Sequence, residues 1–437
     1  MQRILSRELN NHIGEKVLIE GWIHKKRLLG GLTFINVRDR SGLIQIVVDD
    51  KKEVEKLRGL QIGTIVAING NVVKEERAPG GTELHDASIE VMVPVHDEPP
   101  IEIDKPLSHK SDNLDTLFDN RVIGLRNLNE QTIFKVRSQL LKQIRNYLYD
   151  NDFVEIQSPK IVAGNAEGGA EVFNLDYFGK DASLAQSPQL YKQMMVGVFE
   201  RVFEIGPAFR AELSATTRHV SEVTMLDIEM GFLRNYEELL DFIQNMVYKT
   251  ATSVLEDNKE AIKKLNLPEL KLTKQFPRYS VHEIHEMYSK ATGENTIGEK
   301  DLSPAEERWI CEYAKKKDGC EAVYATYLPL EAHKFYQKIN PNDPKTVLSS
   351  DLLFRGIELA TCPMRENDYH KLIEQMKDKN IDPKSQAFES YLKAFKYGLP
   401  EHGGCGFGID RFVQKLMGLD NIKEAILFPR DINRLTP

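Results

Sequence analysis

Apolar and polar residues alternate along the first 96 residues in the pattern typical of β-strands. Glycine- and serine-containing turns separate the runs, and a short helical pattern lies between the third and fourth. The predicted strands are 17–24, 32–39, 43–48, 64–70 and 87–93, and the predicted helix is 51–60. Five short strands with one helix favour an OB-fold barrel over residues 1–96, a fold that often binds single-stranded nucleic acid. An unrelated small barrel is the alternative.

The pattern changes after residue 96. Residues 97–130 contain three prolines among polar residues, which predicts a hinge or linker. Apolar residues then recur at helical spacing from Gln131 to Asp150, and a strand ending in Pro159 follows. Further helices are predicted at 236–257, 303–316, 367–378 and 385–396, mixed with strands. This mixture favours an α+β domain over residues 131–437, built on an antiparallel sheet.

Composition narrows the class of protein. The chain has 437 residues, 41% of them hydrophobic, which predicts two or three domains with sizeable cores. No apolar run approaches the roughly 20 residues of a membrane span, and the N-terminus lacks the apolar region of a signal peptide. The four cysteines form no Cys-x-x-Cys pair, so we expect no zinc or disulfide framework and a cytoplasmic location.

The net charge of −8 argues weakly against a nucleic acid partner. The distribution of charge weakens that objection, because eight basic and only four acidic residues precede Asp49. A local basic face can bind phosphates on a globally acidic protein.

Two arginine-containing segments carry the first functional signal. Val202–Glu212 predicts a strand that ends in Arg-x-Glu at Arg210, and Gly406–Arg411 predicts a strand that leads into a helix. Either arginine alone is a common surface residue. In this order, the two segments resemble motifs 2 and 3 of class II aminoacyl-tRNA synthetases, whose paired arginines hold the phosphates of ATP. The helix–strand–proline segment ending at Pro159 resembles motif 1, which implies a homodimer.

The most specific string is Ala185–Gln193, Ala-Gln-Ser-Pro-Gln-Leu-Tyr-Lys-Gln. It resembles the amino-acid-binding segment of aspartyl-tRNA synthetases. The resemblance implies that Gln186, Gln189 and Lys192 bind L-aspartate, with the Lys192 cation facing the side-chain carboxylate. The same string predicts a helix N-terminus with a serine cap and a proline at the first position, and both interpretations can hold at once.

The resemblance implies three further aspartate-binding residues. Glu167 lies in the glycine-rich stretch 163–170, which is implied to fold over the amino acid; a plain mobile loop is the alternative. Asp227 is implied to help hold the substrate ammonium. Arg365 is implied to pair bidentately with the side-chain carboxylate, a planar geometry that a lysine cannot match.

The resemblance also implies an ATP site with Arg210 and Arg411 as its catalytic residues. Its full set is Arg210, Glu212, Arg218, His219, Asp351, Glu358, Gly408 and Arg411. Asp351 and Glu358 are implied to hold Mg²⁺, which prefers hard oxygen ligands that bridge phosphates. Residues seven apart on one strand face opposite sides, so a shared ion requires a bulge or bend between them.

In the barrel, the resemblance implies that Phe34 stacks on an anticodon base of tRNA and that Gln45 hydrogen-bonds to it. Phe34 as a core residue is the alternative. His24 and Pro79, expected on two barrel loops, resemble the non-discriminating subgroup of archaeal-type enzymes. That subgroup charges aspartate onto both tRNA(Asp) and tRNA(Asn), and an amidotransferase completes the second product.

Two departures from the family keep alternatives open. The string Thr361–Met364 replaces the usual Ser-Gly-Gly or Ser-Gly-Ala turn, so we expect a displaced Arg365 or a reshaped site. Val223 stands where an aromatic ring usually meets adenine, and we expect Phe209 or Arg411 to stack there instead. A paralogue with altered or lost charging is therefore one alternative.

An asparaginyl-tRNA synthetase is the nearest alternative. Lys192 in its Gln-Ser-Pro-Gln context argues against it, because an amide substrate offers no charge to pair.

Overall fold

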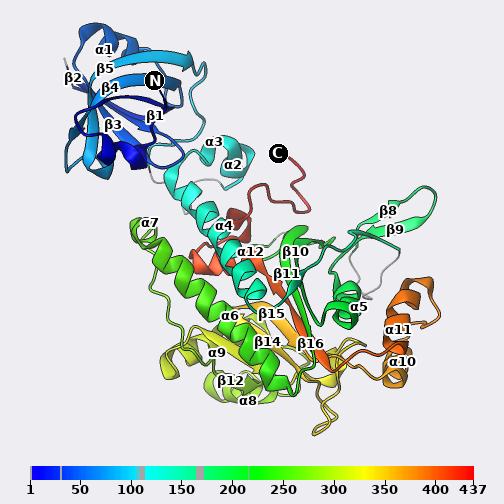
Figure 1. Cartoon of the computed structure of the whole chain (residues 1–437). Coiled ribbons are helices and arrows are strands. Elements are labelled where there is room, and N and C mark those ends of the chain that lie inside the picture. Colours follow the sequence, from blue (N-terminus) through cyan, green and yellow to red (C-terminus); the bar gives the residue numbers. More distant parts are fainter. Residues whose placement is uncertain (1, 30–31, 106, 108–113, 164–171, 215) are drawn as a thin grey trace. The chain divides into compact units, whose positions relative to one another are not determined.

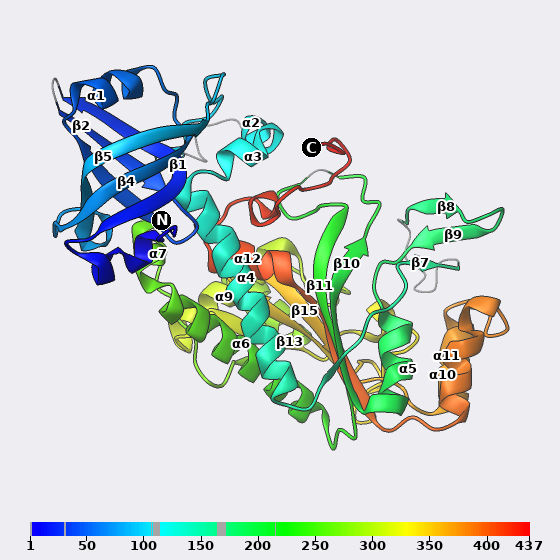
Figure 2. The ribbon, with the colours of Figure 1, turned by 45° about the horizontal axis from the view of Figure 1, so that its top comes forward.

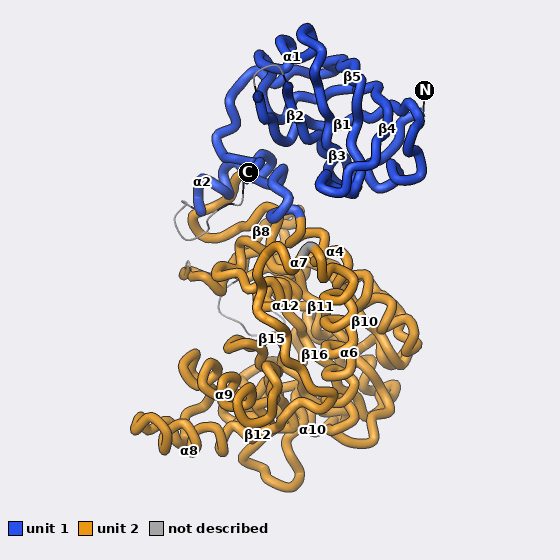
Figure 3. Tube along the Cα trace, turned by 90° about the vertical axis from the view of Figure 1, so that its left-hand side faces the viewer, with its two compact units in different colours: residues 1–131 blue, residues 132–437 orange. Residues whose placement is uncertain are grey.

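The computed structural model describes residues 2–29, 32–105, 107, 114–163, 172–214 and 216–437. The chain divides into two compact units, Met1–Gln131 and Thr132–Pro437 (Figure 3). Each unit has a hydrophobic core of its own. Glu167, which the resemblance assigns to the aspartate site, lies outside the described residues. None of the described helices is long and apolar enough to cross a membrane.

The first unit contains the predicted five-stranded barrel (Figure 1). Its strands are β1 (Lys16–Leu29), β2 (Leu32–Arg38), β3 (Leu43–Val48), β4 (Ile65–Lys74) and β5 (Thr82–Val93). They close in the order β1-β2-β3-β5-β4. A short helix, α1 (Lys51–Arg58), joins β3 to β4, with Asp50 accepting hydrogen bonds from two backbone N–H groups at its N-cap. The 3₁₀ turns η1 (Ser6–His12) and η2 (Pro79–Gly81) complete this part.

Residues on the barrel strands alternate between the core and the outer surface. On β2, Ile35 and Val37 are fully buried in the core, and Phe34, directly before Ile35, points the other way and is half-buried. Phe34 is therefore not a core residue, which removes the alternative interpretation of that position. Strand β1 carries a bulge at His24, between Ile23 and Lys25.

The described part of residues 97–130, predicted as a linker, contains two short helices. They are α2 (Leu114–Asp119) and α3 (Arg121–Gly124), and the long helix α4 (Leu128–Tyr149) begins directly afterwards. The guanidinium of Arg121 lies 3.5 Å from the carboxylate of Glu130, and both side chains are buried.

The second unit is built on an eight-stranded sheet of order β12-β13-β14-β15-β16-β11-β10-β6 (Figure 2). Its strands are β6 (Val154–Glu155), β10 (Arg201–Phe209), β11 (Glu222–Gly231), β12 (Arg278–Ser280), β13 (Ala322–Thr326), β14 (Ser349–Phe354), β15 (Ile357–Pro363) and β16 (His402–Gly408). The pairs from β13 to β10 are antiparallel, and only the two edge pairs are parallel. A separate small sheet contains β7 (Ile161–Val162), β9 (Asp181–Leu184) and β8 (Asn174–Asp176).

Helices cover the two faces of the large sheet unequally. The helices after α4 are α5 (Gln189–Phe199), α6 (Tyr236–Asp257), α7 (Lys259–Lys264), α8 (Val281–Thr292), α9 (Pro304–Lys317), α10 (Tyr369–Asp378), α11 (Glu389–Lys396) and α12 (Ile409–Leu416). The main core joins α4, α6 and α12 to one face of the sheet. Helices α8 and α9 pack against the other face at β13 and β14. The rest of that second face is left for a cavity.

Candidate active site

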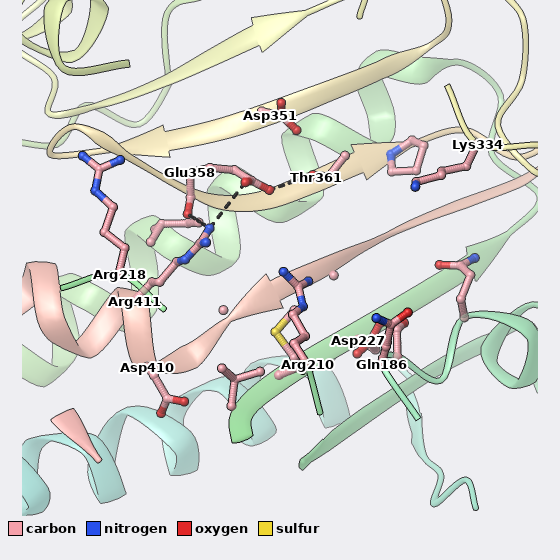
Figure 4. A pocket seen from close by; sticks show the side chains of 18 of the residues that line it. Gln186, Arg210, Arg218, Asp227, Lys334, Asp351, Glu358, Thr361, Asp410 and Arg411 are labelled. Carbon is pink, nitrogen blue, oxygen red and sulfur yellow. Dashed lines mark hydrogen bonds and ion pairs between the residues drawn. The ribbon is translucent and has the colours of Figure 1, made fainter. Parts of the chain in front are cut away.

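A cavity of about 610 Å³ lies on this second face (Figure 4). On β11, Leu226 and Ile228 point into the main core, whereas Asp227 between them lines the cavity. The cavity gathers most of the predicted site residues: Gln186, Gln189, Arg210, Glu212, Arg218, His219, Asp227, Asp351, Glu358, Arg365, Gly408 and Arg411. Gln186 follows β9 and Gln189 begins α5, and the others come from β10, β11, β14, β15, β16 and the segments that follow them.

At one end of the cavity, the floor is a buried network of two cations and two carboxylates. The ammonium of Lys192, on α5, donates to Asp227 Oδ1 and to the backbone oxygen of Cys405, each at 2.9 Å. It also lies 3.6 Å from Glu229 Oε2. Arg365 donates to both oxygens of Glu229, at 2.8 and 3.0 Å. All four charged side chains are at most 2% exposed.

The electrostatics of this network favour its charged form. Burial alone raises the pKa of Glu229, but Arg365 and Lys192 together bring that pKa below its ordinary value. Glu229 in turn raises the pKa of Arg365 against the opposing effect of burial. The charged forms of Glu229 and Arg365 are therefore favoured as an ion pair.

This pairing differs from the sequence-based expectation for Lys192. Its ammonium is bonded beneath the cavity and does not line it, because Asp227 and the Cys405 carbonyl hold it there. Arg365 does line the cavity, although Glu229 already takes one bidentate edge of its guanidinium. Glu229 had no assigned role in the sequence-based account.

The string 185–193 forms the wall above this floor. Helix α5 begins at Gln189 with Pro188 as the N-cap residue and without a side-chain capping bond. The predicted serine cap was therefore wrong, because Ser187 Oγ is directed to Asp227 Oδ1 at 3.4 Å. Gln189 accepts a hydrogen bond from Arg365 Nη2 at 3.0 Å, which links the helix to the network.

At the other end of the cavity, three arginines face carboxylates. Arg210 directly follows β10, its side chain is 45% exposed, and its Nη1 is 3.9 Å from Glu212. Arg218 Nη1 donates to Glu307 Oε2 at 3.2 Å. Arg411, on the first turn of α12, donates to the backbone oxygen of Glu358 at 2.9 Å and lies 3.4 Å from its carboxylate.

His219 joins the same end. Its Nε2 lies 3.5 Å from Glu212 Oε2, so Glu212 stands between this ring and Arg210. Gly408 is the last residue of β16, and a Cβ there would lie 3.5 Å from the Arg411 side chain.

Asp351 and Glu358 meet across a hairpin. The chain reverses at Arg355 and Gly356, both with positive φ, so the two carboxylates lie on neighbouring strands β14 and β15. A bulge at Leu359 shifts the register between them. The bulge and bend that a shared ion would require are therefore both present. Thr361, opposite Asp351, donates to Glu358 Oε1 at 2.8 Å.

Like charges crowd this hairpin. Burial, followed by Glu358, raises the pKa of Asp351 well above its ordinary value. Burial and Glu358 also raise the pKa values of Asp301 and Glu307, which line the same part of the cavity. Asp351 Oδ1 is buried and has no hydrogen-bond partner among the described residues.

The donor set at this hairpin fits Mg²⁺. It offers two carboxylates and a hydroxyl, and a divalent cation would relieve both the unpartnered oxygen and the like-charge repulsion. Within the described residues, no cluster of three or more His, Cys, Asp or Glu side chains could hold a metal ion. An ion here therefore needs further oxygens from a ligand, as Mg²⁺ sites on nucleotides do.

The two sequence departures have different outcomes. Thr361, Cys362 and Pro363 lie within β15, Met364 forms a bridge with Gly403, none of the four has positive φ, and Arg365 still lines the cavity. The altered turn has thus not removed Arg365 from the site. Val223 and Arg411 both line the cavity, but Phe209 does not, so the structure leaves Arg411 as the stacking candidate of the two.

Several lining residues were missed by the sequence-based account. They are Asp301, Glu307, Lys334, Tyr336, Gln337 and Thr361. Asp301 and Glu307 flank Ser303, whose capping box with Glu306 explains this string without any ligand. Nothing in their local pattern indicates a site, because only the packing of α9 against β13 and β14 brings them to the cavity.

On the barrel, Phe34 and Gln45 lie on neighbouring strands, and Gln45 pairs with Asn36 in the register. Gln45 Nε2 donates to Glu83 Oε2 at 2.8 Å, and His85 contacts the other Glu83 oxygen at 2.8 Å. The Gln45 amide is therefore oriented by a neighbouring carboxylate.

His24 and Pro79 occupy different settings. His24 lies within β1, not on the expected loop, and is 6% exposed. Burial, followed by Arg38, lowers its pKa, so the ring is favoured neutral. Its Nδ1 is buried with no hydrogen-bond partner among the described residues. Pro79 begins η2, on the connection between β4 and β5, and is half-buried.

Comparison with known proteins agrees with this geometry. The family described as "tRNA synthetases class II (D, K and N)" matches residues 113–432. A second family, "OB-fold nucleic acid binding domain", matches residues 17–92. The chain therefore belongs to the class II tRNA synthetases of the D, K and N group and, within it, to the archaeal-type aspartyl-tRNA synthetases.

Full-length relatives carry two different names. The chain is 39% identical over 435 residues to the aspartate–tRNA(Asp/Asn) ligase of Thermus thermophilus, covering 100% of both chains. It is 39% identical over 439 residues to the aspartate–tRNA(Asp) ligase of Pyrococcus furiosus, covering 99% of this chain and 98% of that one. Among solved structures, the asparaginyl-tRNA synthetase of Pyrococcus horikoshii complexed with asparaginyl-adenylate is 32% identical. It superposes with a TM-score of 0.91 over 100% of both chains.

Proposed function

We propose that this aspartate–tRNA ligase forms aspartyl-adenylate in the cavity described above, with aspartate over the buried four-residue network and ATP toward the hairpin. The α-carboxylate of aspartate attacks the α-phosphorus of ATP, and pyrophosphate leaves. A terminal hydroxyl of the tRNA 3′ end then attacks the activated carbonyl, and AMP leaves. The observation that supports this arrangement most strongly is the contrast between the two ends of the cavity: one is an ion-paired network, and at the other carboxylates crowd together and Asp351 Oδ1 has no hydrogen-bond partner among the described residues.

In this proposal, Arg210 stabilises the charge that develops on the α-phosphate. It is suited to that role because, among the described residues, its carboxylate neighbour Glu212 is 3.9 Å away, and nearly half its side chain is exposed. Arg411 holds the nucleotide from the first turn of helix α12, and Arg218 and His219 reach the terminal phosphates. Catalysis rests mainly on positioning and on charge stabilisation in a preformed site.

Asp351 and Glu358 would hold Mg²⁺ together with the ATP phosphates. When bound, Mg²⁺ neutralises phosphate charge and fixes the phosphate geometry. Thr361 orients the Glu358 carboxylate through its hydrogen bond.

At the aspartate end, Asp227 receives the substrate ammonium, and Arg365 presents its cavity-facing side to the side-chain carboxylate. Gln186 and Gln189 supply the polar wall, and Glu167 is proposed to close over the ammonium. Lys192 acts mainly from below, because it is ion-paired with Asp227 and Glu229 and holds both in place.

Aspartate-dependent exchange of pyrophosphate into ATP, measured without tRNA, tests this proposal. We expect exchange with L-aspartate and little with L-asparagine. A preference for asparagine would support the asparaginyl alternative, which the solved asparaginyl-tRNA synthetase structure makes worth testing. No exchange with either amino acid would contradict the proposed reaction and favour a paralogue without charging activity.

We further propose that the barrel binds the anticodon and that the enzyme charges both tRNA(Asp) and tRNA(Asn). Phe34 supplies an outward-facing ring, and Gln45 an oriented amide. Pro79 has no N–H to donate, so its turn lacks a donor that a wrong base would leave unpaired. Of the two relatives described above, one is named as a ligase for tRNA(Asp/Asn) and the other as a ligase for tRNA(Asp).

Charging assays on the two purified transcripts decide the choice of tRNA. We expect comparable kcat/KM values. A preference above roughly a hundredfold for tRNA(Asp), about 2.7 kcal/mol, would show that the enzyme discriminates. With comparable charging, a tRNA-dependent amidotransferase would be the functional partner for the misacylated tRNA(Asn).

Assembly and location complete the proposal. A homodimer through the α4–β6 segment is supported by the position of β6 at the sheet edge and by the exposed apolar side chains of Val154 and Ile161. Sedimentation equilibrium should give twice the chain mass of 49.9 kDa. A monomer at micromolar concentration would contradict it. A cytoplasmic location is proposed from membership of the synthetase family.

A further inference from the structure

Among the described residues, one cationic side chain that lines the cavity has no carboxylate within 4.0 Å. The Arg, Lys and His side chains that line it, among the described residues, are Arg210, Arg218, His219, Lys334, Arg365 and Arg411. Every one except Lys334 has a carboxylate within 4.0 Å. The side chain of Lys334 is exposed, and Figure 4 shows it reaching into the space between the strands.

The segment that carries Lys334 is fastened to the aspartate end. Gln337 forms a β-bridge with Arg365, and the Lys338 N–H donates to the Met364 carbonyl at 3.0 Å. Tyr336 packs its ring 5.2 Å from the Arg365 guanidinium. The backbone N–H of Lys334 donates to the Gln337 side chain at 2.9 Å. The position of Lys334 is therefore tied to the residue proposed to recognise the substrate side chain.

The charges of the floor network and of L-aspartate leave a place for one more cation. The floor network contains two cations and two carboxylates, which cancel. L-Aspartate brings one ammonium and two carboxylates, so a neutral floor leaves one substrate carboxylate without a full counter-charge. Arg365 meets it only in part, because Glu229 already holds that guanidinium bidentately.

We propose that Lys334 binds the side-chain carboxylate of L-aspartate and so contributes to the choice of aspartate over asparagine. This inference rests on the proposed function and adds a specificity residue to it. The ammonium closes over the carboxylate from the side opposite the floor, where its three donors need no fixed geometry. Asparagine gains nothing from this contact, because its amide carries no charge.

Lys334→Met tests the proposal through pyrophosphate exchange without tRNA. We expect the KM for aspartate to rise about tenfold, the usual scale of a hydrogen bond to a charged group, with kcat changed by less than about twofold. Asparagine kinetics should stay unchanged, so the preference for aspartate falls by the same factor. Lys334→Arg should recover most of the loss, and added salt should raise the wild-type KM more than that of Lys334→Met.

Lys345→Met is the matched control, because Lys345 is exposed, lies near the same segment in sequence and does not line the cavity. It should behave as wild type. An unchanged KM in Lys334→Met, or equal loss for aspartate and asparagine, overturns the inference. Normal exchange with weakened charging also overturns it, since Lys334 would then serve the tRNA 3′ end. Absence of exchange in the wild type would instead contradict the proposed function itself.

Discussion

The two ends of the cavity solve opposite electrostatic problems. At the aspartate end, Lys192, Asp227, Glu229 and Arg365 are buried and satisfy one another through hydrogen-bonded ion pairs. At the nucleotide end, burial and like charges raise the pKa of Asp351, and one of its oxygens is without a partner among the described residues. The charges of the aspartate end are balanced without a ligand, whereas the nucleotide end would be stabilised by a bound cation.

The two ends of the cavity therefore contribute to ligand binding in different ways. A preformed, neutral floor orients a small amino acid without reorganisation. At the nucleotide end, repulsion between carboxylates slightly lowers the stability of the folded protein. The same repulsion favours cation binding, because a ligand that brings Mg²⁺ relieves it. Substitutions at the two ends should therefore change stability in opposite directions.

The largest expected effect comes from breaking the floor. Lys192→Met removes the cation that holds Asp227 and Glu229, leaving buried carboxylates short of charge. We expect a loss of about 3–5 kcal/mol in aspartate activation, together with a lower free energy of unfolding. Pyrophosphate exchange and thermal unfolding measure the two effects.

Lys338→Met is the control for losing a lysine ion pair. Its pair with Glu401 is partly exposed, so the expected loss of stability is below about 1 kcal/mol. Near-normal exchange by Lys192→Met would show that the floor network does not support aspartate binding.

Arg210→Ala should separate catalysis from stability. Its loose contact with Glu212 contributes little to folding, but its loss should reduce exchange about 10²–10³-fold, as for other removed transition-state donors. Arg234→Ala, at a side chain 84% exposed, is the control. Filter binding should show tRNA affinity largely intact. Equal losses of exchange and tRNA binding would mean that Arg210 has a different role.

Phe34→Ala tests whether the barrel contributes to tRNA charging independently of the two ends of the cavity. Loss of one base stack should weaken charging by about 1–3 kcal/mol. Exchange without tRNA should not change, because no part of the cavity is altered. A parallel fall in both reactions would indicate a folding defect, which circular dichroism of the variant would reveal.

Asp351→Asn gives the smallest expected change in stability, and that change has the opposite sign from the one for Lys192→Met. Removing the crowded carboxylate should raise the free energy of unfolding by about 1 kcal/mol at neutral pH while abolishing Mg²⁺-dependent exchange. The pH dependence follows from the raised pKa. The neutral form of Asp351 is favourable below its ordinary pKa of 3.8, and that contribution is lost as the pH rises through the raised value. The variant's advantage over wild type should therefore grow with pH.

Local pattern predicted much of this molecule. Alternation located the barrel strands, and helical spacing located α4 and α6 closely. The family motifs placed Arg210 directly after β10 and Arg411 on the first turn of α12. These features depend on residues close together in sequence.

Long-range packing explains what the sequence could not predict. Whether Lys192 faces the substrate or Asp227 depends on contacts between α5, β11 and β16. The approach of Glu307 to Arg218 depends on where α9 packs, 89 residues away in sequence. The bulge that places His24 within β1 is likewise set by pairing with β2.

The most direct test compares Lys192→Met and Asp351→Asn without ligands, by denaturant unfolding of the full chain at neutral pH. We expect opposite signs, with a fall of several kcal/mol in the free energy of unfolding for Lys192→Met and a rise of about 1 kcal/mol for Asp351→Asn. Changes of the same sign would contradict the distinction between a paired aspartate end and a repulsive nucleotide end.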